Sequence, residues 1–170
     1  MAYLTTQDTK KNIKVKKTTV TELEELVDDT YTAINGGTIE YIPAPNSTYV
    51  YYEFNSIVSY ATDRSSYGKF RLMYGPDTSN LTSIASNDIN YIAHYGSTGP
   101  YSHLNQKDTV PVKIPFLIPA WEGNKVLVLQ GLDDDEGKDY YINGIRAAAK
   151  SPEEDDADDL FDPFVIVYSC

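Results

Sequence analysis

The chain has 170 residues, of which 41% are hydrophobic and 12% aromatic, enough apolar surface for a single domain with its own core. Its formal net charge of -11 argues against a general nucleic-acid binder, because such binding depends on neutralising phosphates. No apolar run approaches the roughly 20 residues of a membrane span, so we expect no membrane insertion. Residues 1–20 lack the apolar core of a secretory signal, and the single cysteine, Cys170, allows no internal disulfide, so we expect a protein made in a cytoplasm.

A basic arm precedes the acidic body of the chain. Against one acidic residue, Asp8, residues 1–20 carry five lysines: Lys10, Lys11, Lys14, Lys16 and Lys17. An arm of this composition is typical of an attachment segment that docks on a surface, or of a solvated tail. In the first alternative, these lysines are the residues that anchor the protein to a particle.

A short helix is predicted directly after the arm. Thr21 and Glu24 have the spacing of a capping box, which satisfies backbone donors at a helix start. Apolar residues at helical spacing follow: Leu23, Leu26 and Val27. A helix of about two turns is not stable alone in water, so it must pack on the body or on copies of itself. The arm and the helix together form a first segment, residues 1–29.

Residues 30–170 are typical of an all-β domain, because many Tyr, Val, Ile and Thr residues alternate with clusters of turn residues. The predicted strands are 29–34, 38–43, 48–61, 67–75, 88–95, 109–118, 124–132, 138–146 and 162–169. The first two are separated by a predicted turn at Asn35-Gly36-Gly37. Eight or nine short strands in this length predict an antiparallel β-sandwich or jelly roll.

Alternation along the strands predicts which side chains form the core. In the strand 48–61, Val50, Tyr52 and Phe54 fall on one face and Tyr51 and Glu53 on the other, which indicates one buried and one wet face. The strand 109–118 carries a proline at every fourth position. Because proline cannot donate to a strand ladder, we expect that strand at a sheet edge or near a bulge.

The strands 124–132 and 162–169 are apolar on both faces. The second face of each needs a cover, since large exposed apolar patches are rare on monomers. A neighbouring subunit is the simplest cover, and the alternative is a cap formed by the N-terminal helix or a long loop. The predicted subunit interface consists of Val126, Leu127, Leu129, Phe164, Val165 and Val167.

No motif in the sequence predicts an enzyme. His94 and His103 have no nucleophile or metal-spaced partner beside them, so we interpret them as surface or loop histidines. A hydrolase would need two carboxylates facing each other in a cleft, whereas the acidic residues here cluster in runs that are typically solvated. We therefore assign no catalytic residue and expect no cofactor.

Two acidic runs, residues 133–136 and 153–159, are dense in carboxylates. Carboxylate oxygens are calcium ligands, yet neither run matches an EF-hand loop, and solvated loops are the commoner outcome. Calcium binding and simple solvation both stay open for these runs.

A Tyr- and Gly-rich stretch is the candidate for a surface-binding loop. Its residues are Tyr91, Tyr95, Tyr101 and His103. Tyrosine combines a large apolar ring with one polar tip and therefore suits binding surfaces. Loops on a rigid β scaffold commonly carry recognition, so a host glycan or receptor is the ligand that this stretch would take.

The order of the elements resembles a known family. The features that carry the resemblance are the Asn35-Gly36-Gly37 turn, the aromatic strand from Ser47 to Ala61, Gly68-Lys69-Phe70-Arg71-Leu72, the proline-punctuated strand before Trp121, Lys125-Val126-Leu127-Val128-Leu129 and the apolar strand ending in Tyr168. Together they resemble jelly-roll domains of the complement and tumour-necrosis-factor type, especially those of bacteriophage virion proteins. The resemblance covers about residues 30–170 and rests on strand order and texture.

The resemblance implies a compact trimer in the virion, with a non-enzymatic role and no catalytic residues to carry over. The function expected first is a capsid decoration or cement protein, or a short head fibre, anchored by its N-terminal arm to partners such as the major capsid protein. The alternative is the tip of a tail fibre that binds a host receptor or glycan.

Overall fold

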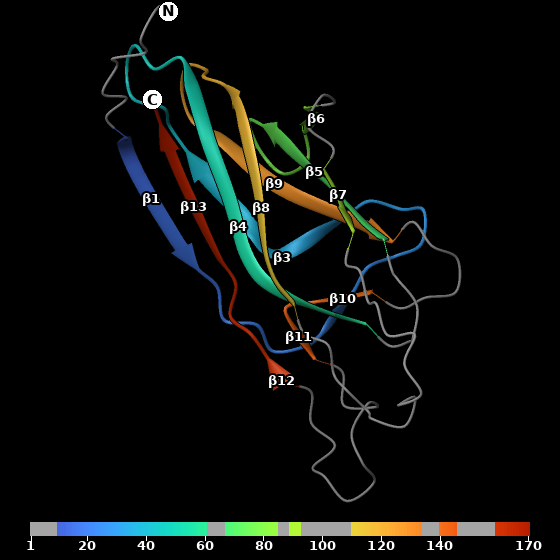
Figure 1. The fold of residues 1–170 in the computed structure, drawn as a ribbon. Helices are drawn as coiled ribbons and strands as arrows, with labels where there is room; N and C mark the ends of the chain where they lie inside the picture. Colours follow the sequence, from blue (N-terminus) through green and yellow to red (C-terminus); the bar gives the residue numbers. More distant parts are fainter. Residues whose placement is uncertain (1–9, 61–66, 85–88, 93–109, 134–139, 146–158) are drawn as a thin grey trace, which may run out of the picture.

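A computed structural model gives the fold of the chain (Figure 1), and it describes residues 10–60, 67–84, 89–92, 110–133, 140–145 and 159–170. Within these ranges all the regular elements are β-strands, and the strands pair antiparallel. The prediction of an all-β, antiparallel fold is therefore confirmed.

The first sheet has six strands, in the order β1–β13–β4–β10–β2, with β8 paired to the opposite side of β4. Their bounds are β1 (Lys11–Lys17), β2 (Glu24–Glu25), β4 (Tyr49–Tyr60), β8 (Val110–Pro119), β10 (Tyr140–Ile142) and β13 (Phe164–Ser169). Figure 1 shows β1, β13, β4 and β8 side by side along one flank of the molecule. We call this the first sheet throughout.

The second sheet has five strands, in the order β3–β9–β5–β6, with β7 also paired to β5. Their bounds are β3 (Thr32–Tyr41), β5 (Tyr67–Gly75), β6 (Thr82–Ser83), β7 (Ile89–Ile92) and β9 (Lys125–Asp133). A separate short pair joins β11 (Gly144–Ile145) to β12 (Asp159–Leu160).

One hydrophobic core lies between the two sheets. Val50, Tyr52 and Phe54 of β4 are fully buried in it, as the alternation of that strand predicts. The second sheet contributes Leu127 and Leu129 to the same cluster. The one polar tip of Tyr52 is satisfied there, because its hydroxyl donates to the carbonyl of Gly37 at 2.7 Å. Two antiparallel sheets facing each other across a shared core agree with a β-sandwich.

The basic arm is docked rather than free in the part that the structure describes. Residues 11–17 form β1, which pairs antiparallel with β13 and makes an edge of the first sheet. All seven residues of β1 are nevertheless exposed, because the strand covers the rim and not the centre of the core. The described part of the arm is therefore a strand of the protein's own first sheet and not a free tail, and its attachment to another surface stays a prediction.

The predicted helix after the arm is wrong. Residues 21–29 instead contain β2, and Asp28 forms an isolated bridge with Asp133. Two backbone hydrogen bonds hold that bridge: the Asp133 N–H donates to Val27 at 3.1 Å and the Asp29 N–H donates to Asp133 at 3.0 Å. Pairing to β9, together with burial of Leu26, outweighs a two-turn helix whose nucleation is unfavourable.

The predicted turn at residues 35–37 is also wrong, because the chain continues through it as one strand, β3. The pairing of β3 with β9 shifts register between Ala33 and Thr38, which marks a β-bulge. Gly36 adopts a φ of +80° there, a conformation that glycine accepts without strain. Gly36 thus supplies the left-handed residue of a bulge within β3, and not a turn between two strands.

The proline-rich strand lies at a sheet edge, as predicted. Within the described residues β8 pairs with β4 alone. Pro111, Pro115 and Pro119 share one parity along β8, so all three nitrogens can face the free edge without removing a ladder hydrogen bond.

Candidate functional site: an apolar sheet face and a clamped edge

The outer face of the first sheet carries apolar side chains on four neighbouring strands. Directly paired residues of an antiparallel ladder share a face, so the register gives the rows. One row runs from Val15 through Ile166 and Glu53 to Pro115. The next row contains Tyr168, Tyr51 and Leu117, in that order.

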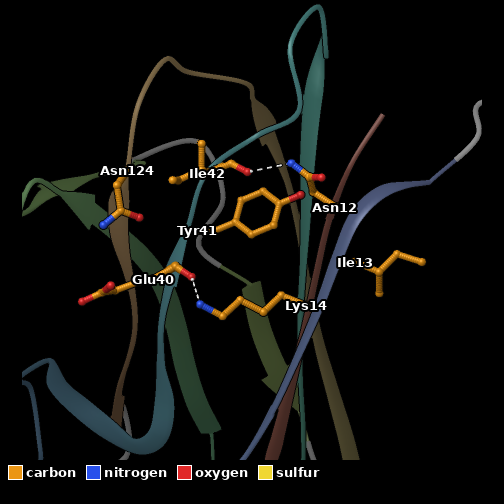
Figure 2. Close-up of a pocket in the computed structure, with 7 residues that line it drawn as sticks. All are labelled: Asn12, Ile13, Lys14, Glu40, Tyr41, Ile42 and Asn124. Atoms are coloured by element: carbon orange, nitrogen blue, oxygen red, sulfur yellow. Dashed lines mark hydrogen bonds between the residues drawn. The ribbon is translucent and has the colours of Figure 1, made fainter.

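Several of these apolar side chains are open to solvent. Ile13, Val15 and Leu117 are 59%, 60% and 56% exposed, values typical of polar surface residues. Figure 2 shows Ile13 pointing away from the core side of β1, where Lys14 points toward β3. We define the outer apolar face by its members: Ile13, Val15, Tyr49, Tyr51, Leu117, Phe164, Ile166 and Tyr168.

A satisfied carboxylate lies in the middle of the outer apolar face. The Tyr51 hydroxyl donates to Glu53 Oε2 at 2.6 Å, and the Asn55 amide donates to Glu53 Oε1 at 3.1 Å. Tyr51 also stacks on Tyr168, with 4.9 Å between ring centroids. Burial, and next the hydrogen bond to Glu53, raise the pKa of the Tyr51 hydroxyl, so it stays a donor at neutral pH. The face therefore presents an ordered surface with its central polar groups paired.

Most of the predicted subunit-interface residues lie inside the single chain. Leu127, Leu129, Val165 and Val167 are completely buried between the two sheets. Phe164 alone of the six falls on the outer face of the first sheet, where it pairs with Asn55. The apolar second face of β13 is thus open, because the residues that occupy it are Phe164 and its alternate neighbours, not Val165 and Val167.

The second face of β9 has its cover within the chain. Val126 and Val128 are buried there with Met73 of the neighbouring strand β5. Leu81, in the segment between β5 and β6, packs against this small cluster. For β9, the second apolar face is therefore covered by the protein's own chain and not by a subunit. The cover is a segment that connects two strands, not a helix.

A second feature joins the edges of the two sheets where β1 faces β3 (Figure 2). Three side chains of β1 donate to backbone carbonyls of β3 and of the residue after it: Asn12 Nδ2 to Ile42 at 3.3 Å, Lys14 Nζ to Glu40 at 2.8 Å, and Lys16 Nζ to Thr38 at 2.8 Å. We call Asn12, Lys14 and Lys16 the β1 clamp. The Tyr41 hydroxyl adds a bond in the reverse direction, to the Lys11 carbonyl at 3.2 Å.

Two shallow hollows of about 580 Å³ and 300 Å³ lie along the same edge. Asn12, Tyr41 and Asn124 line the larger one, and Lys16 and Thr78 line the smaller one. Lys14 and Glu40 line both, so the bond between them spans the groove from β1 to β3 (Figure 2).

The predicted anchoring lysines largely have partners in their own chain. Besides the two clamp lysines, Lys17 forms an ion pair with Asp162 at 3.1 Å, and Lys10 lies 4.6 Å from the ring centroid of Tyr168. Lys11 contributes its backbone carbonyl, as described for Tyr41. Binding of a particle by the clamp lysines or Lys17 would have to compete with these bonds.

The predicted binding loop lies mostly outside the described residues. Tyr91 belongs to β7, whereas Tyr95, Tyr101 and His103 fall in the ranges of which nothing is described, as do residues 134–136 and 153–158. Among the residues that are described, no three or more His, Cys, Asp or Glu side chains lie together as a metal site would require. Nor does the described part of the chain contain a helix long and apolar enough to cross a membrane.

Ile13 and Val15 are the surface residues that sequence reasoning missed. They alternate with Asn12, Lys14 and Lys16, which is the period of a strand. The charge of this segment indicates an arm, whereas the alternation of its apolar and polar residues predicts a strand with two distinct faces.

A scan of protein-family models and a search of curated proteins find no match to this chain.

Proposed function

We propose that this protein is a non-enzymatic structural protein of a bacteriophage virion, a jelly-roll sandwich that decorates or cements the capsid, or forms a short head fibre, as a trimer. The observation that supports this proposal is the outer apolar face, with three aliphatic side chains more than half exposed on β1 and β8. Exposed aliphatic side chains gathered on one face are typical of sites where proteins contact one another.

The details of this face suit contact with copies of the same chain. It is a sheet surface of four paired strands, and its tyrosines offer rigid contact area at little entropic expense. Glu53 can be covered without losing its two hydrogen bonds, so burial leaves no unpaired donor or acceptor on it. A closed cyclic trimer would bury the same face in every subunit, as the resemblance to trimeric jelly rolls implies.

The first experiment measures solution mass by light scattering after size exclusion. The wild type is expected at three times the chain mass of 19.0 kDa. Val15→Lys combined with Leu117→Lys places two charges on the outer apolar face and should give monomers, because both side chains are more than half exposed and neither supports the core.

Val27→Lys is the matched control, since Val27 is 47% exposed and lies outside the outer apolar face. It should leave the mass unchanged. A wild type that stays monomeric, and that also fails to sediment with purified phage shells, would overturn the proposal.

The proposal includes attachment to the particle through the basic arm, by Lys10, Lys11, Lys14, Lys16 and Lys17. Binding by the last three would have to replace their intrachain bonds. Among the anchoring lysines, Lys11 has the side chain that would break the fewest intrachain bonds on binding a shell. Lys11→Glu should therefore weaken co-sedimentation with shells more than Lys113→Glu on β8. Equal binding by both variants would remove the arm from the attachment site. Binding of host cells by the isolated protein would instead favour the tail-fibre tip.

A further inference from the structure

We propose that the β1 clamp acts as a lock, which means that it prevents another strand from pairing with the free edge of β3. When the clamp is removed, this edge pairs with β3 of a second copy of the chain. The inference does not depend on the outer apolar face or on a phage origin. It rests on the geometry of Asn12, Lys14 and Lys16 against the backbone of β3.

The free edge of β3 is a strand-addition surface by its position. Among the residues that the structure describes, β3 is the end strand of the second sheet and pairs with β9 alone. In an antiparallel ladder each residue points both its N–H and its C=O to the same side, and the side alternates along the strand. Because the carbonyls of Thr38 and Glu40 accept from β1, the N–H groups of these two residues also face the free edge. Exposed rows of this kind recruit further strands.

The β1 clamp fits this row in phase. Alternate residues of a strand lie about 6.6–6.8 Å apart, so side chains at positions 12, 14 and 16 repeat at the spacing of the carbonyls at 42, 40 and 38. A shift in the β1–β13 register between Lys11 and Lys14, with Asn12 at a φ of 50°, sets the phase that turns both clamp lysines toward β3. Ammonium groups placed here occupy the acceptors and put positive charge where another strand would have to lie.

A second copy is the occupant because it carries the same free edge at the same concentration. Two β3 edges that meet antiparallel form a contact related by a two-fold axis, which closes as a pair instead of propagating. Such a pair would join two five-stranded sheets into one continuous sheet, with backbone hydrogen bonds as the specific element.

The test removes the lock and then blocks the edge. Lys14→Ser with Lys16→Ser withdraws both ammonium groups without adding apolar surface, and we expect the solution mass at least to double and to rise with concentration. Adding Glu40→Pro should restore the wild-type mass, because proline removes a free-edge N–H while leaving the bonds to β9 intact. Glu40→Pro alone should behave as the wild type.

Lys11→Ser with Lys113→Ser is the control for charge, since it removes the same two positive charges from side chains that make no bond to β3. This control should keep the wild-type mass. Folding of each variant is checked by near-ultraviolet circular dichroism, and the single variants Lys14→Ser and Lys16→Ser replace the double variant if it does not fold. An unchanged mass in the unlocked variants, or an increase that Glu40→Pro fails to reverse, would overturn the proposal.

Discussion

Asn143 ties four segments of the chain together at one buried position. Its side chain accepts from the Ser56 hydroxyl at 2.7 Å and donates to the Asn35 carbonyl at 3.0 Å. Its backbone donates to Ile57 at 3.0 Å and accepts from the Phe161 N–H at 2.8 Å. Asn143 also holds a φ of 68°, in the left-handed region that asparagine tolerates better than most residues. Asparagine therefore suits this position in two ways, through the bonds of its side chain and through its tolerance of a left-handed backbone.

Asn143→Ala should lower the free energy of unfolding by about 2–4 kcal/mol, because it leaves the Ser56 hydroxyl with only a long contact to the Ile57 carbonyl at 3.4 Å, removes the donor to the Asn35 carbonyl and strains the backbone. Asn143→Gly loses the same hydrogen bonds without that strain, and should be about 1 kcal/mol less damaging. Urea unfolding followed by the fluorescence of Trp121, the single tryptophan, measures both. Wild-type stability in the alanine variant would contradict this role.

Glu24 gives the fold a pH dependence of defined sign. Its carboxylate accepts from the Asn35 N–H at 2.8 Å, yet burial raises its pKa above the ordinary value of 4.5. Between its unfolded and folded pKa values the native state holds a proton that the unfolded state has lost. The contribution of Glu24 to stability is therefore most favourable below about pH 4.5 and falls as the pH rises through the folded pKa.

Glu24→Gln removes this titration while keeping a side-chain oxygen as acceptor. The unfolding free energy of the variant minus that of the wild type should increase from pH 4 to pH 7, whatever its value at pH 4. Urea midpoints at a series of pH values give this difference directly. A difference that stays flat or decreases with pH would show that burial does not control this carboxyl group.

At the scale of elements, the bulge in β3 is the site most sensitive to a small change. A Cβ on Gly36 would lie 2.5 Å from Pro163 Cγ, at a φ of +80°. Gly36→Ala should therefore destabilise by about 2–4 kcal/mol, from left-handed strain and steric overlap together. Gly123 has nearly the same φ, +79°, and nothing within 4 Å of its added Cβ. Gly123→Ala is thus the control for strain alone, at about 1 kcal/mol, and equal effects in urea unfolding would exclude the overlap.

The elements that the sequence predicts well are those whose pattern reflects burial on one face. β4 and β5 follow their predicted bounds closely, since Val50, Tyr52 and Phe54 alternate with polar or half-exposed residues. The proline spacing of β8 likewise predicts an edge, because the missing N–H groups are a local property that the sheet cannot change.

The failures have tertiary causes. Capping signals at Thr21 and Glu24 are local, whereas the carboxylate of Glu24 is used by the Asn35 N–H, from a distant strand. Lys14 and Lys16 of β1 donate to carbonyls at the free edge of β3, and no local sequence pattern predicts that this edge lies beside them. Leu127 and Leu129 lie in the core between the sheets, whereas Val126 and Val128 lie on the opposite face of β9 under Leu81, so an apolar run alone does not show whether its second face is covered by the same chain or by a subunit.

At the scale of the whole molecule, folding and association should respond to different leucines. Leu129 is buried in the core of the single chain, so Leu129→Ala should lower the free energy of unfolding by about 2–5 kcal/mol and leave the solution mass unaltered. Leu117, on the outer apolar face, should behave in the opposite way when changed to Lys. Unfolding curves and light scattering on both variants separate the two roles, and a loss of assembly in Leu129→Ala would contradict them.

The pairing of β1 with β13 also determines when the first sheet can finish folding during translation. Lys11 and Ser169, neighbours in the first sheet, are 158 residues apart in the chain. A ribosome adds about 5–20 residues per second, so β1 exists for roughly 8–30 s before its partner strand has been made. β1 is therefore made early but can pair with β13 only when synthesis of that strand is finished. A ribosome that stalls before β13 leaves β1 without its strand partner.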